Sequence, residues 1–186
     1  MRLLARCRRL AATRPLKSLR EALAVGEASV VALDLSTSEE LLCRNIMCEH
    51  VGERCACRLA LWFHQHELPN LQALNLSRNE LRHVPEPVCR LSKLRHLDLS
   101  HNKLQNLPDC LDRLVALQTL DLRGNALDDF PDVLGALPSL DTLSLDFAPP
   151  EDRWQPLLQS ETAARDGTPS HVVYRRRHLV DSSSYC

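Results

Sequence analysis

Aromatic residues and glycine are scarce in this sequence, and neither charge is in marked excess. Phe, Trp and Tyr make up 4% of the 186 residues, which leaves leucine to fill the interior, and the five glycines form no phosphate-binding loop. The formal net charge is −1, so the chain as a whole has no strong attraction for nucleic acid or an acidic membrane. No apolar run approaches the roughly 20 residues of a membrane-spanning helix. We therefore predict a single soluble domain without a membrane span.

Motifs for catalysis are missing as well. The sequence has no nucleophile elbow, and no spacing pairs a base with an activated nucleophile. Histidine and cysteine both occur, but so do many unrelated pairs in any chain of this size. We expect no enzymatic activity, no cofactor and no small-molecule substrate.

The most regular feature that is present is a 23-residue repeat. Its units run over residues 71–93, 94–116 and 117–139, followed by a partial unit at 140–158. Each unit opens with L-x-x-L-x-L, whose last two leucines lie two apart, the period of a strand, so both point to one face. Because one unit is too small to bury its leucines, neighbouring units must stack and pair their strands into a parallel sheet.

The rest of each unit is also regular. An asparagine holds the ninth place in each full unit, at Asn79, Asn102 and Asn125. An apolar residue and a proline follow, at 84–85, 107–108 and 130–131, and then two apolar residues three apart, which is the spacing of a helical turn that faces the core. Cys89 and Cys110 lie in these turns, where we predict small buried thiols.

The repeat resembles the typical short form of the leucine-rich repeat family. The resemblance covers about half of the chain and implies an α/β solenoid with parallel strands on a concave face and a helical cap at its N-terminal end. It also implies that the asparagines bond to the backbone along a ladder and have a structural role. Small intracellular members of the family act as scaffolds or adaptors that bind proteins.

The resemblance predicts the boundaries of the repeat domain within the chain. We expect a leucine-rich repeat domain at 16–158, preceded by a basic leader or tail at 1–15 and followed by a C-terminal tail at 159–186, which we expect to be mobile from roughly residue 165 onward. The N-terminal cap is predicted as a helix at 16–25. The strand motif VVALDLS then opens a first repeat that spans 30–70, which includes an insertion of about one unit. The apolar spacing of this insertion predicts two short helices, or one helix broken near Gly52.

The insertion also gathers residues that bind metals. They are cysteine and histidine, at Cys43, Cys48, His50, Cys55, Cys57, His64 and His66. Zinc takes four such ligands, but the cysteines are separated by four, six and one residues, and one helix cannot bring four of them together. A zinc site would need the chain to fold back at Gly52. We predict buried thiols and no metal.

The cysteines and residues 1–20 indicate the cellular compartment of the protein. Eight scattered cysteines and no secretory signal favour a reducing, cytoplasmic location. Residues 1–20 contain seven basic side chains and no acid, which is typical of a mitochondrial presequence. The alternatives for this segment are a basic solvated tail and a basic contact to an acidic partner.

The concave face supplies the candidate binding site. Its candidates are the side chains that the repeat does not dictate, Arg78, His96, His101 and Arg123, together with the neighbouring aspartates Asp98 and Asp121. The aspartates are equally consistent with a solvated strand face. The leading hypothesis is a non-enzymatic scaffold or adaptor that binds a protein on this face. The alternative is a structural subunit of a ribonucleoprotein, possible in mitochondria, that contacts RNA through its basic ends.

Overall fold

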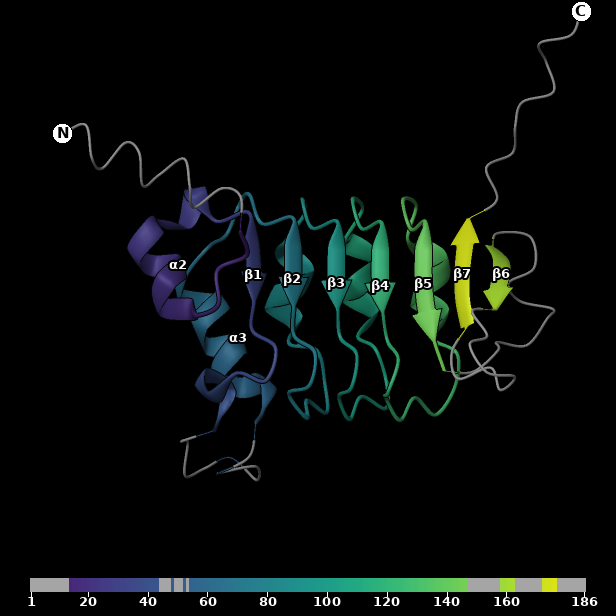
Figure 1. The fold of residues 1–186 in the computed structure, drawn as a ribbon, viewed down its shortest axis with the longest axis horizontal. Coiled ribbons are helices and arrows are strands. Elements are labelled where there is room, and N and C mark those ends of the chain that lie inside the picture. Colours follow the sequence, from purple (N-terminus) through teal and green to yellow (C-terminus); the bar gives the residue numbers. More distant parts are fainter. Residues whose placement is uncertain are drawn as a thin grey trace, which may run out of the picture.

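A computed structural model describes residues 14–43, 48, 52, 54–146, 158–162 and 172–176. Five short parallel strands form the centre of the fold in chain order (Figure 1). They are β1 (Ala32–Asp34), β2 (Ala73–Asn75), β3 (His96–Asp98), β4 (Thr119–Asp121) and β5 (Thr142–Leu145). Leu74 pairs with Leu97, and Leu97 with Leu120, so the register advances by one unit from strand to strand. The predicted parallel sheet is confirmed.

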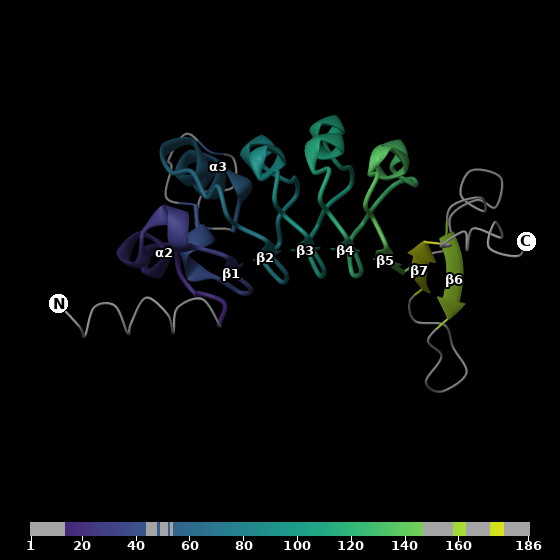
Figure 2. The same ribbon diagram turned by 90° about the horizontal axis from the view of Figure 1, so that it is seen from above.

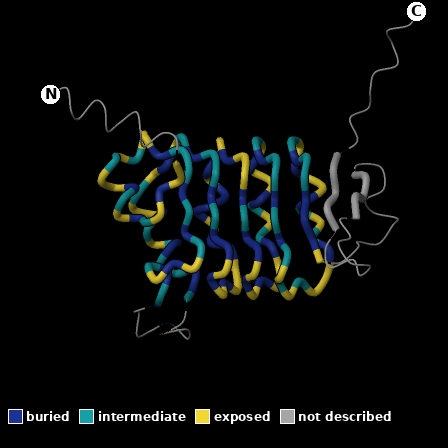
Figure 3. Tube along the Cα trace, viewed as in Figure 1, coloured by how far each residue is buried: buried dark blue, intermediate teal, exposed yellow. Residues whose placement is uncertain are grey.

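Short 3-10 helices form the opposite side of the solenoid (Figure 2). They are η3 (Glu86–Arg90), η4 (Asp109–Arg113) and η5 (Asp132–Ala136), and each begins directly after the proline of its repeat. Val88, Leu111 and Leu134 point from these turns into the core and are buried. The predicted core-facing turns are therefore confirmed, and the strand leucines belong to the same core. Figure 3 shows buried positions in dark blue along the strands.

The repeat asparagines join each unit to the unit before it. The Nδ2 of Asn102 donates to the carbonyls of Leu76 and Leu99, at 3.0 and 2.9 Å. Its Oδ1 accepts from the backbone N–H groups of Asn79 and Leu81, at 3.1 and 3.0 Å. Asn79 and Asn125 also bond to their preceding units, so the predicted ladder is present.

The N-terminal cap is shorter than predicted. Helix α2 spans Leu19–Val25, and the hydroxyl of Ser18 caps it by accepting from the N–H of Glu21. Leu16 precedes the helix and forms a parallel bridge to Leu33 at the edge of β1. The spacing of Leu16, Leu19 and Leu23 predicts one buried apolar face, but Leu23 is 44% exposed while the other two are buried. The segment η1 (Glu27–Ser29) then leads into β1.

Among the described residues, the insertion contains two helical segments, while most of the residues predicted as a helix before Gly52 lie outside the described part. The first is η2 (Glu39–Leu41), and the second is α3 (Ala56–Gln65). Leu59 and Phe63 of α3 are buried in the main core, and α3 lies against both η2 and η3. The insertion therefore completes the N-terminal end of the solenoid. The predicted ligand His50 lies outside the described residues.

Two further strands extend the sheet at its C-terminal end. Strand β7 (Val172–Arg176) pairs with β5 in antiparallel orientation, and β6 (Leu158–Thr162) pairs with β7. Strand β7 lies in the segment that the sequence predicted to be mobile, from roughly residue 165 onward. That expectation is corrected for these residues, because they cover the edge of the last parallel strand. The remaining residues of the segment lie outside the described part of the chain.

The two cysteines of the convex turns are also corrected. Cys89 of η3 and Cys110 of η4 form a disulfide with their Cα atoms 5.8 Å apart, whereas the sequence predicted two free thiols. The reason is the stacking itself, because η3 and η4 belong to adjacent units and lie side by side. The bridge therefore fastens two neighbouring repeats on the convex side.

Candidate functional site

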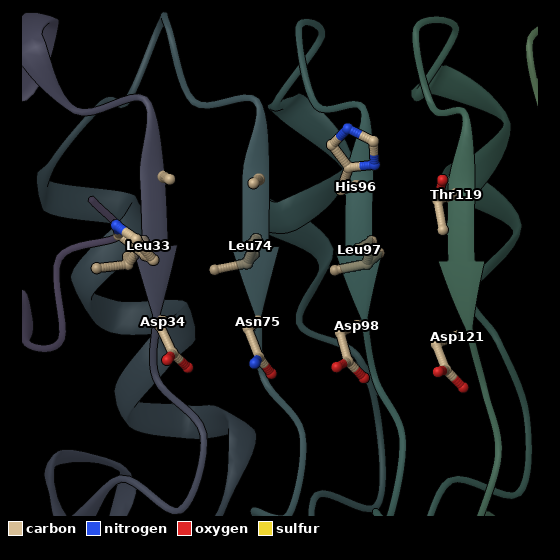
Figure 4. Close-up of a pocket in the computed structure, with 12 residues that line it drawn as sticks. Leu33, Asp34, Leu74, Asn75, His96, Leu97, Asp98, Thr119 and Asp121 are labelled. Atoms are coloured by element: carbon tan, nitrogen blue, oxygen red, sulfur yellow. The ribbon is translucent and has the colours of Figure 1, made fainter. Parts of the chain in front are cut away.

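Two columns of side chains cross the concave face of the sheet. The strand register places one residue of each strand in each column. The first column contains Ala32, Ala73, His96, Thr119 and Thr142. The second contains Asp34, Asn75, Asp98, Asp121 and Ser144 (Figure 4). The predicted residues His96, Asp98 and Asp121 are therefore brought together on adjacent strands.

The second column has a structural role. The Oδ1 of Asp34 accepts a hydrogen bond from the N–H of Ser36 two residues later, at 3.1 Å. Asn75, Asp98 and Asp121 make the equivalent bond in their own repeats, at 2.9, 2.9 and 3.1 Å. An amide makes this bond as well as a carboxylate does, since Asn75 occupies the same place. The negative charge of the three aspartates is therefore additional to what the turn requires.

Arg123 is paired within the same face. Its Nε donates to the Oδ1 of Asp121 at 2.9 Å, and its Nη2 donates to Oδ2, which gives a bidentate ion pair. The hydrogen bond from Arg123 to Asp121 raises the pKa of the guanidinium. The pair neutralises Asp121, whereas Asp34 and Asp98 form no ion pair among the described residues, although Arg123 also attracts Asp98 at longer range. Arg123 is therefore held in an ion pair with Asp121, whereas the sequence predicted that Arg123 contacts the partner.

Arg78 and His101 lie in the loops just after the strands. Both have left-handed backbone conformations, with φ of 57° and 53°, and Thr37 and Gly124 hold the same place in their units. The N–H of His101 donates to the carbonyl of Arg123 at 2.6 Å, so the loop conformation passes from unit to unit. Both side chains are exposed at one rim of the concave face, beyond the ends of the strands.

Replacing Gly124 with alanine is expected to lower the free energy of unfolding by about 2 kcal/mol. Gly124 has φ of 68°, and a Cβ there would lie 2.5 Å from the Nδ1 of His101. Removing the ring with His101→Ala keeps the backbone strain and relieves that contact. A double-mutant cycle measured by urea unfolding should therefore give a favourable coupling of about 1 kcal/mol. Additive effects would contradict the proposed contact between Gly124 and His101.

A shallow hollow of about 310 Å³ lies on the concave face and extends from β1 to β4. Pro15 and the alanines Ala32 and Ala73 line it with small side chains, while Asp34 and Asp98 line one edge (Figure 4). The sequence-based site did not include Asp34 or the two alanines. The signal was available, because VVALDLS places Asp34 at the same position of the strand motif as Asn75.

The cysteines of the insertion gather away from this face. The sulfur atoms of Cys43, Cys48, Cys55 and Cys57 all lie within 4.8 Å of one another. Burial raises the pKa of the Cys55 and Cys57 thiols. The two histidines that the sequence considered beside them have other positions. His64 lines a separate hollow, and the Nδ1 of His66 lies 2.7 Å from a carboxylate oxygen of Glu27.

Two family models and one solved structure agree with the geometry. A model described as Leucine rich repeat matches residues 62–104, and one described as Leucine Rich repeats (2 copies) matches residues 92–135. An LRR protein of Leptospira interrogans is 30% identical over 74% of this chain, with a TM-score of 0.52. The Listeria monocytogenes protein InlP is 18% identical over 80% of the chain, with a TM-score of 0.42.

The chain is short beside both of these structures. It spans 37% of the Leptospira chain and 44% of the Listeria chain. No curated protein matches the sequence. Within the part of the chain that the structure describes, no helix has the length and apolar character needed to cross a membrane.

Proposed function

Because this chain is a leucine-rich repeat protein, we propose that it binds a protein partner on its concave face, and that the partner presents a basic segment there. Leucine-rich repeat domains generally mediate protein–protein interaction, and the family is typically non-enzymatic. The observation that carries the proposal is the position of Asp34 and Asp98 along a hollow lined with alanine.

The hollow fits the shape of a long basic side chain. The alkyl stem of lysine or arginine packs on small apolar side chains such as Ala32 and Ala73, while its charged head reaches a carboxylate. Asp34 and Asp98 lie two strands apart, which is about 10 Å. Two basic residues seven positions apart on one helix face are separated by a similar distance, about 10.5 Å. A basic helix that crosses the strands can therefore reach both aspartates.

The negative charge of Asp34 and Asp98 favours a protein partner over RNA on the concave face. Asp34 and Asp98 repel phosphate, so RNA is disfavoured on the concave face itself. Of the basic ends, Arg175 and Arg176 belong to β7, whereas residues 1–13 lie outside the described part of the chain. An RNA complex therefore depends on the ends of the chain and not on the face that carries the proposal.

Neutralising the two aspartates is the direct test. In the double variant Asp34→Asn and Asp98→Asn the amide keeps the turn bond, as Asn75 does naturally, so only the charge is lost. We expect the yield of protein crosslinks to fall about tenfold, because two charge pairs together contribute about 1.4 kcal/mol. The measurement places a photo-reactive amino acid at His96 in cells and quantifies the captured partners by mass spectrometry.

The controls use the other side of the solenoid. A photo-reactive residue at Val115, which is 54% exposed between η4 and β4, should not capture the same partner. Asp112→Asn removes one exposed carboxylate from η4 and should leave the yield unchanged. Equal capture at both positions would overturn the concave site. Recovery of RNA that weakens steeply with salt, and that is lost when residues 1–13 and 172–186 are deleted, would favour the ribonucleoprotein.

A further inference from the structure

Four cysteine side chains converge in the insertion between β1 and β2. The sulfur atoms of Cys43 and Cys57 lie 3.3 Å apart, those of Cys48 and Cys55 lie 3.9 Å apart, and no pair among the four exceeds 4.8 Å. The cluster is on the side of α3, away from the concave face, so it is independent of the proposed partner site. We propose that these four cysteines bind one structural zinc ion.

The distances fit a tetrahedral metal site. Zinc binds thiolates at about 2.3 Å, which places the sulfurs of a tetrahedral site about 3.8 Å from one another. The observed separations lie on both sides of this value. They are too long for bonded sulfur, which requires about 2.05 Å. They are also too short for an iron–sulfur cluster, in which the cysteines bind separate iron atoms that sulfide bridges hold apart.

The backbone explains how widely spaced cysteines meet. Gly52 has φ of 87°, and its N–H donates to the carbonyl of Cys43 at 2.9 Å. Leu42 and Arg54 then form an antiparallel bridge, and the N–H of Cys55 donates to the carbonyl of Leu41 at 3.0 Å. The chain therefore folds back at Gly52, the condition that the sequence set for a zinc site. The prediction of no metal did not expect this fold-back.

The surroundings suit a charged metal centre. Binding releases four protons from the thiols and leaves a zinc tetrathiolate with a net charge of −2. Arg54 and Arg58 flank the cluster in sequence, and Arg58 donates to the carbonyl of Leu42, next to the ligand Cys43. Cys55 lies at the N-terminal end of α3 and Cys57 in its first turn, where the helix dipole favours negative charge. Cys43 and Cys55 are buried, which limits competition from water.

The zinc ion would fix one end of the solenoid. It links the segment after η2, through Cys43, to the first turn of α3, through Cys55 and Cys57. Helix α3 in turn places Leu59 and Phe63 in the main core. The metal would therefore hold α3 in the position from which these two side chains enter the core.

Metal analysis of the full chain tests the site. Protein purified under reducing conditions without chelators should contain about one zinc ion per chain by inductively coupled plasma mass spectrometry. After the metal is stripped, added Co²⁺ should give the visible absorption of a tetrahedral tetrathiolate, and one equivalent of Zn²⁺ should abolish it. Cys57→Ala should weaken zinc binding at least about 100-fold, since losing even an outer-shell partner costs 10- to 100-fold.

The convex disulfide provides the matched control. The variant Cys89→Ala with Cys110→Ala also removes two cysteines, and it should retain the full zinc content. The cobalt titration of the unsubstituted chain keeps the test decisive if Cys57→Ala does not fold. The proposal is overturned if the reduced chain holds no zinc and gives no cobalt absorption, or if it holds iron in place of zinc. It is also overturned if mass spectrometry finds disulfides between Cys43 and Cys57 and between Cys48 and Cys55 in protein kept under reducing conditions.

Discussion

Replacing Asn102 with alanine is expected to lower the free energy of unfolding by about 4 kcal/mol. The side chain is buried and bonds to five backbone groups of two adjacent units, those of Asn79, Leu81, Leu76, Leu99 and Ser100. Alanine fills part of the space but satisfies none of them, and each buried group without a partner costs about 1–3 kcal/mol. Water entering the gap compensates for only part of this loss.

Urea unfolding followed by circular dichroism measures the effect. Asn106→Ala is the matched control, because Asn106 lies four residues later in the same unit and is exposed. Its replacement should change stability by less than about 0.5 kcal/mol. A similar small effect for Asn102→Ala would mean that the ladder does not hold the units together.

Removing the disulfide between Cys89 and Cys110 is expected to cost about 3 kcal/mol. The two residues are 21 apart in sequence, and the bridge restricts the unfolded chain by closing that loop. The variant Cys89→Ala with Cys110→Ala keeps both positions apolar, so the lost bond dominates the change. Thermal unfolding should show a midpoint lower by roughly 10 °C, given about 3 °C per kcal/mol for a chain of this size.

Reduction supplies the control for this prediction. A membrane-permeant thiol label and mass spectrometry should find the pair blocked before a reductant is added and reactive afterwards. The reductant should lower the unfolding midpoint of the unsubstituted chain and leave that of the double variant unchanged. A midpoint that is insensitive to the reductant in both proteins would show that the bridge does not stabilise the fold. Because cytosolic disulfides are rare, the same labelling in cells also tests the predicted cytoplasmic location.

The parts of the fold that repeat were predictable, because the repeat states the physical requirement several times. Leucines at the same positions of each strand define the sheet. The asparagine after each strand defines the ladder, and the proline before each turn defines the convex side. The chain departs from the expectation where no second unit offers the same pattern. Strands β6 and β7 belong to no repeat, and they pair only because β5 leaves an open edge.

The contacts between cysteines could not be predicted from any single segment of the sequence. Cys89 and Cys110 are separated by 21 residues and not by 23, and they meet because stacking brings neighbouring turns together. The zinc ligands depend on a fold-back at Gly52 that no helical or strand period encodes. The candidate binding face was predicted for its central strands, whereas Asp34 was missed because its strand stands one insertion away from the regular units.

The asparagine ladder also gives the chain a direction. The side chain of Asn79 bonds to backbone groups of Leu35 and Ser38 in the preceding unit. In the same way, Asn102 bonds to Asn79, and Asn125 bonds to Leu104. Each turn therefore receives its bonds from residues that leave the ribosome later. During synthesis, a unit stays incomplete until about one further repeat has emerged, so the solenoid closes from its N-terminal end with a constant delay of one unit.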